Sequence, residues 1–175
     1  MIRPVSLASL NLESLQGFLQ VCGPLFEHSP WVAARTWPRR PFASLAALHH
    51  ELVSTVNKAT REEKIELIRA HPDLVGGFSS QKDSPLSAAS AHEQAAAGLD
   101  SLTKEEATLF QEYNREYHDK FGFPFLICAL ENRKDAILKA FPHRLGQTRD
   151  QEIATALDEI NKIAWLRLKD AVREE

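Results

Sequence analysis

The 175-residue sequence contains little cysteine and no long hydrophobic run. Cys22 and Cys128 show neither a CxxC nor a metal-ligand spacing, so we expect small buried thiols, no disulfide and a reducing compartment. Nowhere do about 18 uncharged apolar residues follow one another, and the N-terminus lacks the apolar segment of a signal peptide. The final VREE also differs from a peroxisomal SKL-type ending. These absences predict a cytoplasmic protein without a membrane span.

The sequence also lacks the patterns of nucleic-acid and metal binding. Its 21 basic and 24 acidic residues leave a net charge of −3, whereas nucleic-acid-binding domains usually carry a basic face. It has no HExxH motif, no cluster of cysteine and histidine, and no glycine-rich phosphate loop. Adjacent His49 and His50 would point about 100° apart on a helix, so they cannot readily share one ion. We therefore expect no metal and no nucleic-acid partner.

The spacing of apolar residues predicts an all-α fold. Helical periodicity occurs over residues 12–22, 42–58, 62–70, 90–97, 104–120, 135–140 and 151–172. Capping-box patterns, in which Ser or Thr precedes Glu or Gln by three residues, mark helix starts at Thr60, Ser90, Thr103 and Thr148. Residues 121–130 look β-like but contain Pro124, so we interpret them as an extended turn that enters a helix. Length and short loops predict a single multi-helical bundle domain over residues 1–175.

His71 is the first candidate for chemistry. It follows Leu67 and Ile68 at helical spacing, so it should face inward or into a pocket. Pro72 ends the helix, which leaves the imidazole at the negative carbonyl end. The structural alternative is a histidine that only caps the last carbonyls. The irregular segment 73–89 has a length typical of functional loops, and we expect its glycine-containing part to move over a substrate.

Glu93 and Arg167 each fit two interpretations. Glu93 either closes a capping box with Ser90 or, together with the Ser90 hydroxyl, holds a polar ligand at the positive end of its helix. Arg167 lies on the apolar face of the last predicted helix. Either its stem packs while its head meets water or a structural carboxylate, or its guanidinium binds an anionic or amide-bearing ligand through two hydrogen bonds.

Short motifs along almost the whole chain resemble one family. They are HPDL at 71–74, SAHEQAAAGL at 90–99, NREYHDKFGFPFLIC at 114–128 and EINKIAWLRL at 159–168. In this order they are similar to the OHCU decarboxylase family, which acts on 2-oxo-4-hydroxy-4-carboxy-5-ureidoimidazoline in urate breakdown. Gln147 departs mildly from the family, which tends to have Asn there. The resemblance implies an all-helical, cofactor-free and usually homodimeric carboxy-lyase with a small-molecule substrate.

The resemblance also implies roles for individual residues. His71 takes the place of the catalytic histidine, Glu93 that of the active-site carboxylate, and Pro72 lines the site. Ser90, Gln94 and Arg167 take ligand-holding places. The backbone of Phe121, Gly122, Phe123, Pro124, Phe125, Leu126 and Ile127 would supply amides and carbonyls to the ring and ureido group.

The implied reaction converts the ureidoimidazoline to (S)-allantoin. Electrons released with CO2 flow into the ring C=N, and C5 is then protonated on one face. The sequence leaves open whether His71 or Glu93 delivers that proton. The alternative function is a non-catalytic helical module that binds a ureide or a partner protein.

Overall fold

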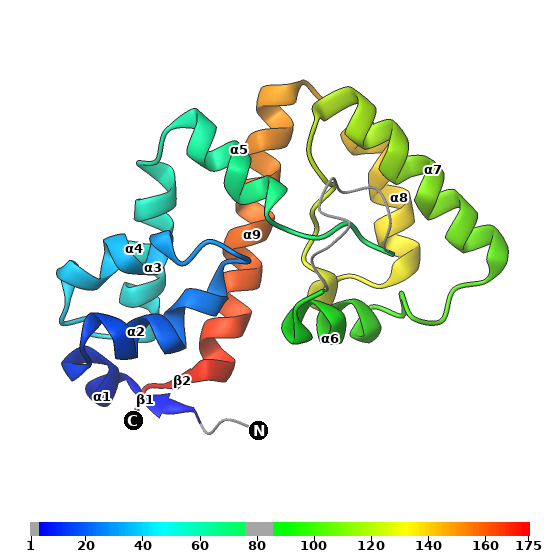
Figure 1. Cartoon of the computed structure of the whole chain (residues 1–175). Coiled ribbons are helices and arrows are strands. Elements are labelled where there is room, and N and C mark those ends of the chain that lie inside the picture. The colour runs from blue at the N-terminus through cyan, green and yellow to red at the C-terminus, as the bar shows by residue number, and fades with distance from the viewer. Residues whose placement is uncertain (1–3, 76–85) are drawn as a thin grey trace. The chain divides into compact units, whose positions relative to one another are not determined.

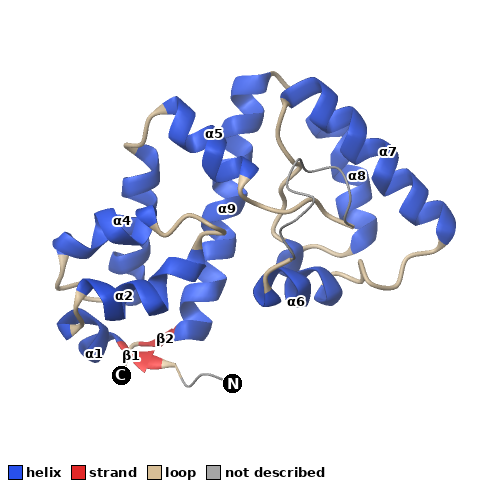
Figure 2. Ribbon diagram, in the orientation of Figure 1, coloured by secondary structure: helices blue, strands red, loops and turns tan. Residues whose placement is uncertain are grey.

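The computed structural model describes residues 4–75 and 86–175, and its regular structure is almost entirely helical (Figures 1 and 2). The α-helices are α1 Leu7–Leu12, α2 Leu15–Cys22, α3 Trp31–Thr36, α4 Leu45–Asn57, α5 Arg61–Arg69, α6 Ala88–Ala96, α7 Lys104–Phe121, α8 Lys134–Leu145 and α9 Arg149–Ala171. Short 3-10 helices occupy Gly23–Leu25, Trp37–Arg39 and Ala129–Glu131. Strands β1 Val5–Ser6 and β2 Val172–Arg173 pair in parallel, with Val5 opposite Val172. The predicted all-α class is confirmed.

The chain divides into two compact units, which we describe separately. Unit 1 comprises residues 1–67 and 161–175, and unit 2 comprises residues 68–160. In the described part of the chain, no helix combines the length and apolar character that a membrane crossing requires. That residues 1–175 form one domain stays a prediction.

Unit 1 is built around α4 and the C-terminal part of α9, with α3 packed against α4. Helices α1, α2 and α4 begin after serines whose hydroxyls accept hydrogen bonds from the first turn, namely Ser6, Ser14 and Ser44. Ser14 starts α2, so the predicted helix over 12–22 begins later, after a separate α1. The core contains fully buried Phe18, Cys22, Phe26, Leu48, Leu52 and Val56.

In unit 2, α7 packs beside α8 (Figure 1). The unit encloses an aromatic core. The core contains the buried rings of Phe110, Tyr117, Phe121, Phe123, Phe125 and Phe141. Residues 122–128 form neither helix nor strand and lead into the 3-10 helix Ala129–Glu131, so the predicted extended turn is confirmed. α8 continues past the predicted residue 140, because Pro142 is accommodated inside the helix.

The capping boxes at Thr60, Thr103 and Thr148 are confirmed by reciprocal hydrogen bonds with the residue three positions later. The predicted box of Ser90 with Glu93 is wrong. α6 begins at Ala88, because the hydroxyl of Ser87 is the cap and accepts the backbone N–H of Ser90 at 3.1 Å. Ser90 and Glu93 therefore lie inside the helix, and the burial of Glu93 needs another explanation.

Both cysteines are free and buried, and burial raises the pKa of Cys22 to about 12 and that of Cys128 to about 11, above the ordinary 9.0. The folded state thus retains these protons to higher pH than the unfolded chain. The resulting stabilisation is complete below pH 9 and is lost as the pH rises toward these raised values. We expect a thiol reagent at pH 8 to modify the native protein far more slowly than the urea-unfolded protein. Equal rates would contradict the buried thiols.

Candidate active site

His71 lies just beyond the end of α5. The helix ends at Arg69, and the backbone N–H of His71 donates to the carbonyl of Ile68 at 3.2 Å. The residue is only 4% exposed, so its imidazole is held inside the protein and not in water. The predicted helix end and inward position are both confirmed. The glycine-containing part of the loop, residues 76–85, lies outside the described residues.

The segment that follows His71 is held by side chains from α6 and α7. Gln94 uses both ends of its amide: Nε2 donates to the Asp73 carbonyl at 3.2 Å, and Oε1 accepts the Val75 N–H at 3.2 Å. Asn114 Nδ2 donates to the Leu74 carbonyl at 2.7 Å. Val75 has φ +60°, a region that β-branched residues rarely adopt. Contacts from two helices therefore fix the conformation of this segment, and not the intrinsic backbone preferences of its residues.

Asp73 is held by its side chain as well as by its backbone. Its Oδ1 lies 2.8 Å from Nε2 of His118, which lies in the last turn of α7. The Asp73 side chain is 1% exposed, whereas the His118 side chain is 22% exposed. Sequence reasoning did not single out Asn114 or His118. Their spacing of four on the helix that also carries buried Tyr117 is the signal that could have found them.

Glu93 and Gln94 are adjacent buried polar residues of α6, each 9% exposed. Because Ser87 caps the helix, Glu93 is not part of a capping box, and the structural alternative given for it above fails. Burying a carboxylate is costly unless it is paired and hydrogen-bonded. Ser90 is also buried, and its Oγ accepts a hydrogen bond from the Ser87 hydroxyl at 3.1 Å.

The segment 121–127 crosses unit 2 with several of its carbonyls bound by arginines. Arg69 Nε donates to the Gly122 carbonyl at 3.0 Å, and Arg149 Nε donates to that of Phe121 at 3.1 Å. Arg144 donates to the carbonyl of Leu126. Gly122 has φ +77°, which glycine adopts at little cost at the end of α7. The bond from Arg69 connects the segment to the residue two positions before His71.

A buried charge network supports the same segment. Arg144 and Glu152 are 5% and 0% exposed, and Arg144 binds the carboxylate through Nε at 2.9 Å and a terminal nitrogen at 2.8 Å. The Tyr117 hydroxyl donates a hydrogen bond to the Glu152 carboxylate, and burial raises the pKa of Tyr117. The Arg144 guanidinium also lies 4.3 Å from the centre of the Phe125 ring. Sequence reasoning missed this network, because its residues come from three separate helices.

Arg167 belongs to unit 1, whereas the other predicted site residues belong to unit 2. Its guanidinium lies 3.1 Å from the buried Glu27 carboxylate and 3.3 Å from the Pro24 carbonyl. The structural alternative for Arg167, a carboxylate partner, is therefore present. A ligand-binding role for the same residue stays a prediction.

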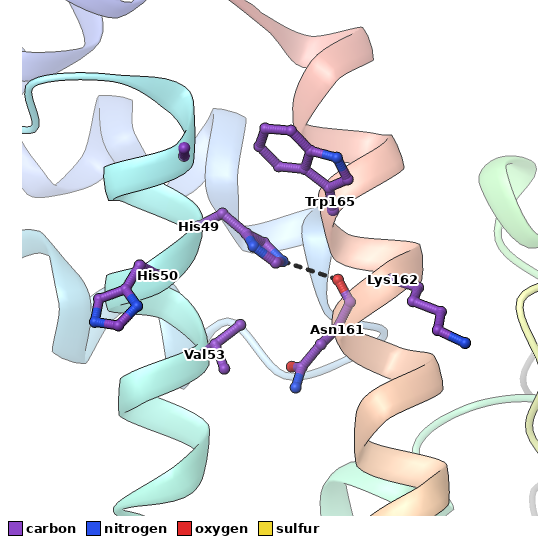
Figure 3. A pocket seen from close by; sticks show the side chains of 7 residues that line it. His49, His50, Val53, Asn161, Lys162 and Trp165 are labelled. Carbon is purple, nitrogen blue, oxygen red and sulfur yellow. Dashed lines mark hydrogen bonds between the residues drawn. The ribbon is translucent and has the colours of Figure 1, made fainter.

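Unit 1 also contains an open cavity of about 530 Å³ between α4 and α9 (Figure 3). It is lined by Ala46, His49, His50, Val53, Asn161, Lys162 and Trp165. His49 bonds the Asn161 carbonyl at 2.9 Å and lies against Trp165, whereas Figure 3 shows His50 on another side of α4. The described residues hold no group of three or more side chains suited to a metal ion. None of the predicted site residues lines this cavity.

The chain is similar to known proteins over nearly its whole length. The family model described as OHCU decarboxylase matches residues 11–169. The 2-oxo-4-hydroxy-4-carboxy-5-ureidoimidazoline decarboxylase of Halalkalicoccus jeotgali is 39% identical over 95% of this chain and 91% of its own length. The protein of the same name from Haloferax volcanii is 39% identical over 98% of both chains.

A solved structure has a similar fold. A crystal structure of (S)-allantoin synthase superposes with a TM-score of 0.77 at 28% identity. The match covers 97% of this chain and 54% of that one, so this chain spans about half the length of that protein. The ordered motifs, the helical fold and the match of sequence over nearly the whole length agree, and the chain belongs to the OHCU decarboxylase family.

Proposed function

We propose that the protein is a carboxy-lyase that converts 2-oxo-4-hydroxy-4-carboxy-5-ureidoimidazoline to (S)-allantoin in urate degradation. The observation that carries the proposal is a buried histidine, His71, on a segment fixed by α6 and α7, in a chain whose close relatives bear that decarboxylase's name. A buried imidazole in a fixed backbone is suited to directed proton transfer.

The substrate itself supplies the electron sink. When the bond between C4 and its carboxylate breaks, the electron pair moves toward C5 and the ring imine nitrogen takes up a proton. The C4 hydroxyl then gives up its proton to become a carbonyl, and C5 receives one. The protein must hold the substrate and direct protons to one face, and the reaction as proposed needs no cofactor.

We assign proton transfer around the C4 hydroxyl and C5 to His71. Glu93 orients His71 or the hydroxyl, and its negative charge near the leaving carboxylate disfavours the bound ground state. Ser90, Pro72 and the 121–127 backbone line the site, and Arg167 holds a ring or ureido carbonyl. Gln94 takes a ligand-holding place through the amide hydrogen that its two bonds to the 73–75 backbone leave over. A homodimer and a cytoplasmic location stay predictions.

The direct test generates the substrate in situ from urate and follows optical activity. With the protein present, we expect (S)-allantoin to form in excess over the other enantiomer, and faster than allantoin forms without the protein. Racemic allantoin at the spontaneous rate would contradict the enzyme and favour the binding module.

Glu93→Gln tests the assigned carboxylate. The amide keeps the shape of the side chain but removes its charge, so we expect kcat to fall by about 10- to 100-fold while the helix content and Tm stay near wild type. Circular dichroism and the optical assay measure the two effects. Glu62→Gln, on the surface turn of α5, is the control for charge removal. If Glu93→Gln unfolds the protein, Glu93 has a structural role.

A further inference from the structure

His118 makes a contact that the proposed chemistry does not yet use. Its Nε2 lies 2.8 Å from Oδ1 of Asp73, and the Asp73 side chain is 1% exposed. A carboxylate can only accept, so the ring nitrogen donates. Buried carboxylates depend on such donors. Asp73 follows the imidazole-bearing His71 by two residues, with Pro72 between them.

The connection between Asp73 and His71 is short and stiff. The proline ring fixes the φ of Pro72 and restricts the backbone of His71, so few free rotations separate the two residues. On the other side, the backbone of residues 73–75 is held by Gln94 and Asn114. The His118 bond adds a contact to a side chain of this segment, that of Asp73.

We propose that His118 is a positioning residue for the reaction, because its hydrogen bond to Asp73 sets the direction in which the His71 imidazole points. The inference rests on the proposed function. His118 itself is in the last turn of α7, partly exposed and outside the aromatic core. Its replacement should therefore disturb His71 more than it disturbs the fold.

The kinetic test uses a series of variants at position 118. His118→Leu removes the donor, whereas His118→Gln can place an amide nitrogen where the ring Nε2 was. We expect kcat of His118→Leu to fall by about 10- to 100-fold with KM changed less than about threefold, since small misplacements of a reacting group are costly. His118→Gln should recover to within about threefold of wild type. His143→Leu, at an exposed histidine of α8, is the matched control and should leave kcat unchanged.

The second readout does not depend on turnover. In protein labelled with ¹⁵N-histidine, we expect the ring resonances of His71 to shift in His118→Leu, to return in His118→Gln and to stay in place in His143→Leu. If His118→Leu does not fold, His118→Asn, whose amide is too short to reach Asp73, takes its place in the comparison with His118→Gln.

Two results would overturn the inference. One is an unchanged His71 ring signal in the variant that lacks the donor. The other is an equal loss of kcat in His118→Gln and His118→Leu, because a donor at the right place would then not matter. If the wild-type protein fails to turn the ureidoimidazoline over, the proposed function fails, and the His71 signal still decides whether His118 positions that ring.

Discussion

His71→Asn is expected to reduce kcat/KM by about 10²- to 10⁴-fold, the range that a positioned general acid–base contributes, and to leave the spontaneous, racemic reaction. Asparagine is polar and fits the space of the imidazole, but it cannot take up and release a proton near neutral pH. The backbone N–H that donates to Ile68 is kept, so the end of α5 should survive. The readouts are the optical assay for activity and thermal unfolding for stability.

The matched control is His49→Asn, the same substitution at a histidine of unit 1. His49 bonds the Asn161 carbonyl and lies 5.2 Å from the Trp165 ring, so its loss costs contacts without touching unit 2. We expect His49→Asn to lower Tm, because these contacts are lost, while keeping the kcat of wild type. If His71→Asn retains (S)-allantoin formation within about threefold of wild type, below the smallest contribution expected of an acid–base group, His71 only ends the helix.

Much of the fold could be predicted from local patterns. Apolar periodicity located α4, α5, α7 and α9 to within a few residues, and capping boxes marked the starts of α5, α7 and α9. The Ser90–Glu93 box does not form because the Ser87 hydroxyl accepts the backbone N–H of Ser90. In a capping box that N–H would donate to the Glu93 carboxylate. A capping pattern shows that a residue can cap, but the competition between neighbouring serines is decided only in the folded chain.

The candidate site was predictable in part. The position of His71 followed from its spacing and from Pro72, since both are local. The bonds of Asn114 to Leu74 and of His118 to Asp73 join residues 40 and 45 positions apart, and a polar residue on a helix gives no sign of its distant partner. The family resemblance predicted residues that would contact a ligand. It did not identify those that hold the site together.

The second large effect concerns stability. Glu152→Ala is expected to lower the free energy of unfolding by about 3–5 kcal/mol, because it leaves the buried guanidinium of Arg144 without its carboxylate. For a chain of this size that corresponds to a fall in Tm of roughly 6–20 °C. This loss is a large fraction of the free energy of unfolding of a typical protein, about 5–15 kcal/mol. Urea unfolding followed by circular dichroism measures the change.

The exposed pair of Arg39 and Glu51 provides the control. Both side chains are 33% exposed, and surface ion pairs contribute about 0–1 kcal/mol. Glu51→Ala should therefore change the unfolding free energy by less than about 1 kcal/mol. A similarly small effect of Glu152→Ala would show that water or a rearrangement compensates the buried charge of Arg144. The network would then contribute little to the free energy of unfolding.

The double variant Arg144→Met/Glu152→Leu separates the charge from the packing. Replacing a buried ion pair by apolar residues of similar size is often nearly neutral, whereas removing one partner strands the other. We therefore expect the double variant to be more stable than Glu152→Ala. It still loses the donor to the Leu126 carbonyl and the acceptor for the Tyr117 hydroxyl. Because Leu126 belongs to the segment assigned to the substrate, the double variant should fold and yet have a reduced kcat. Full activity would mean that packing of the aromatic core alone holds this segment.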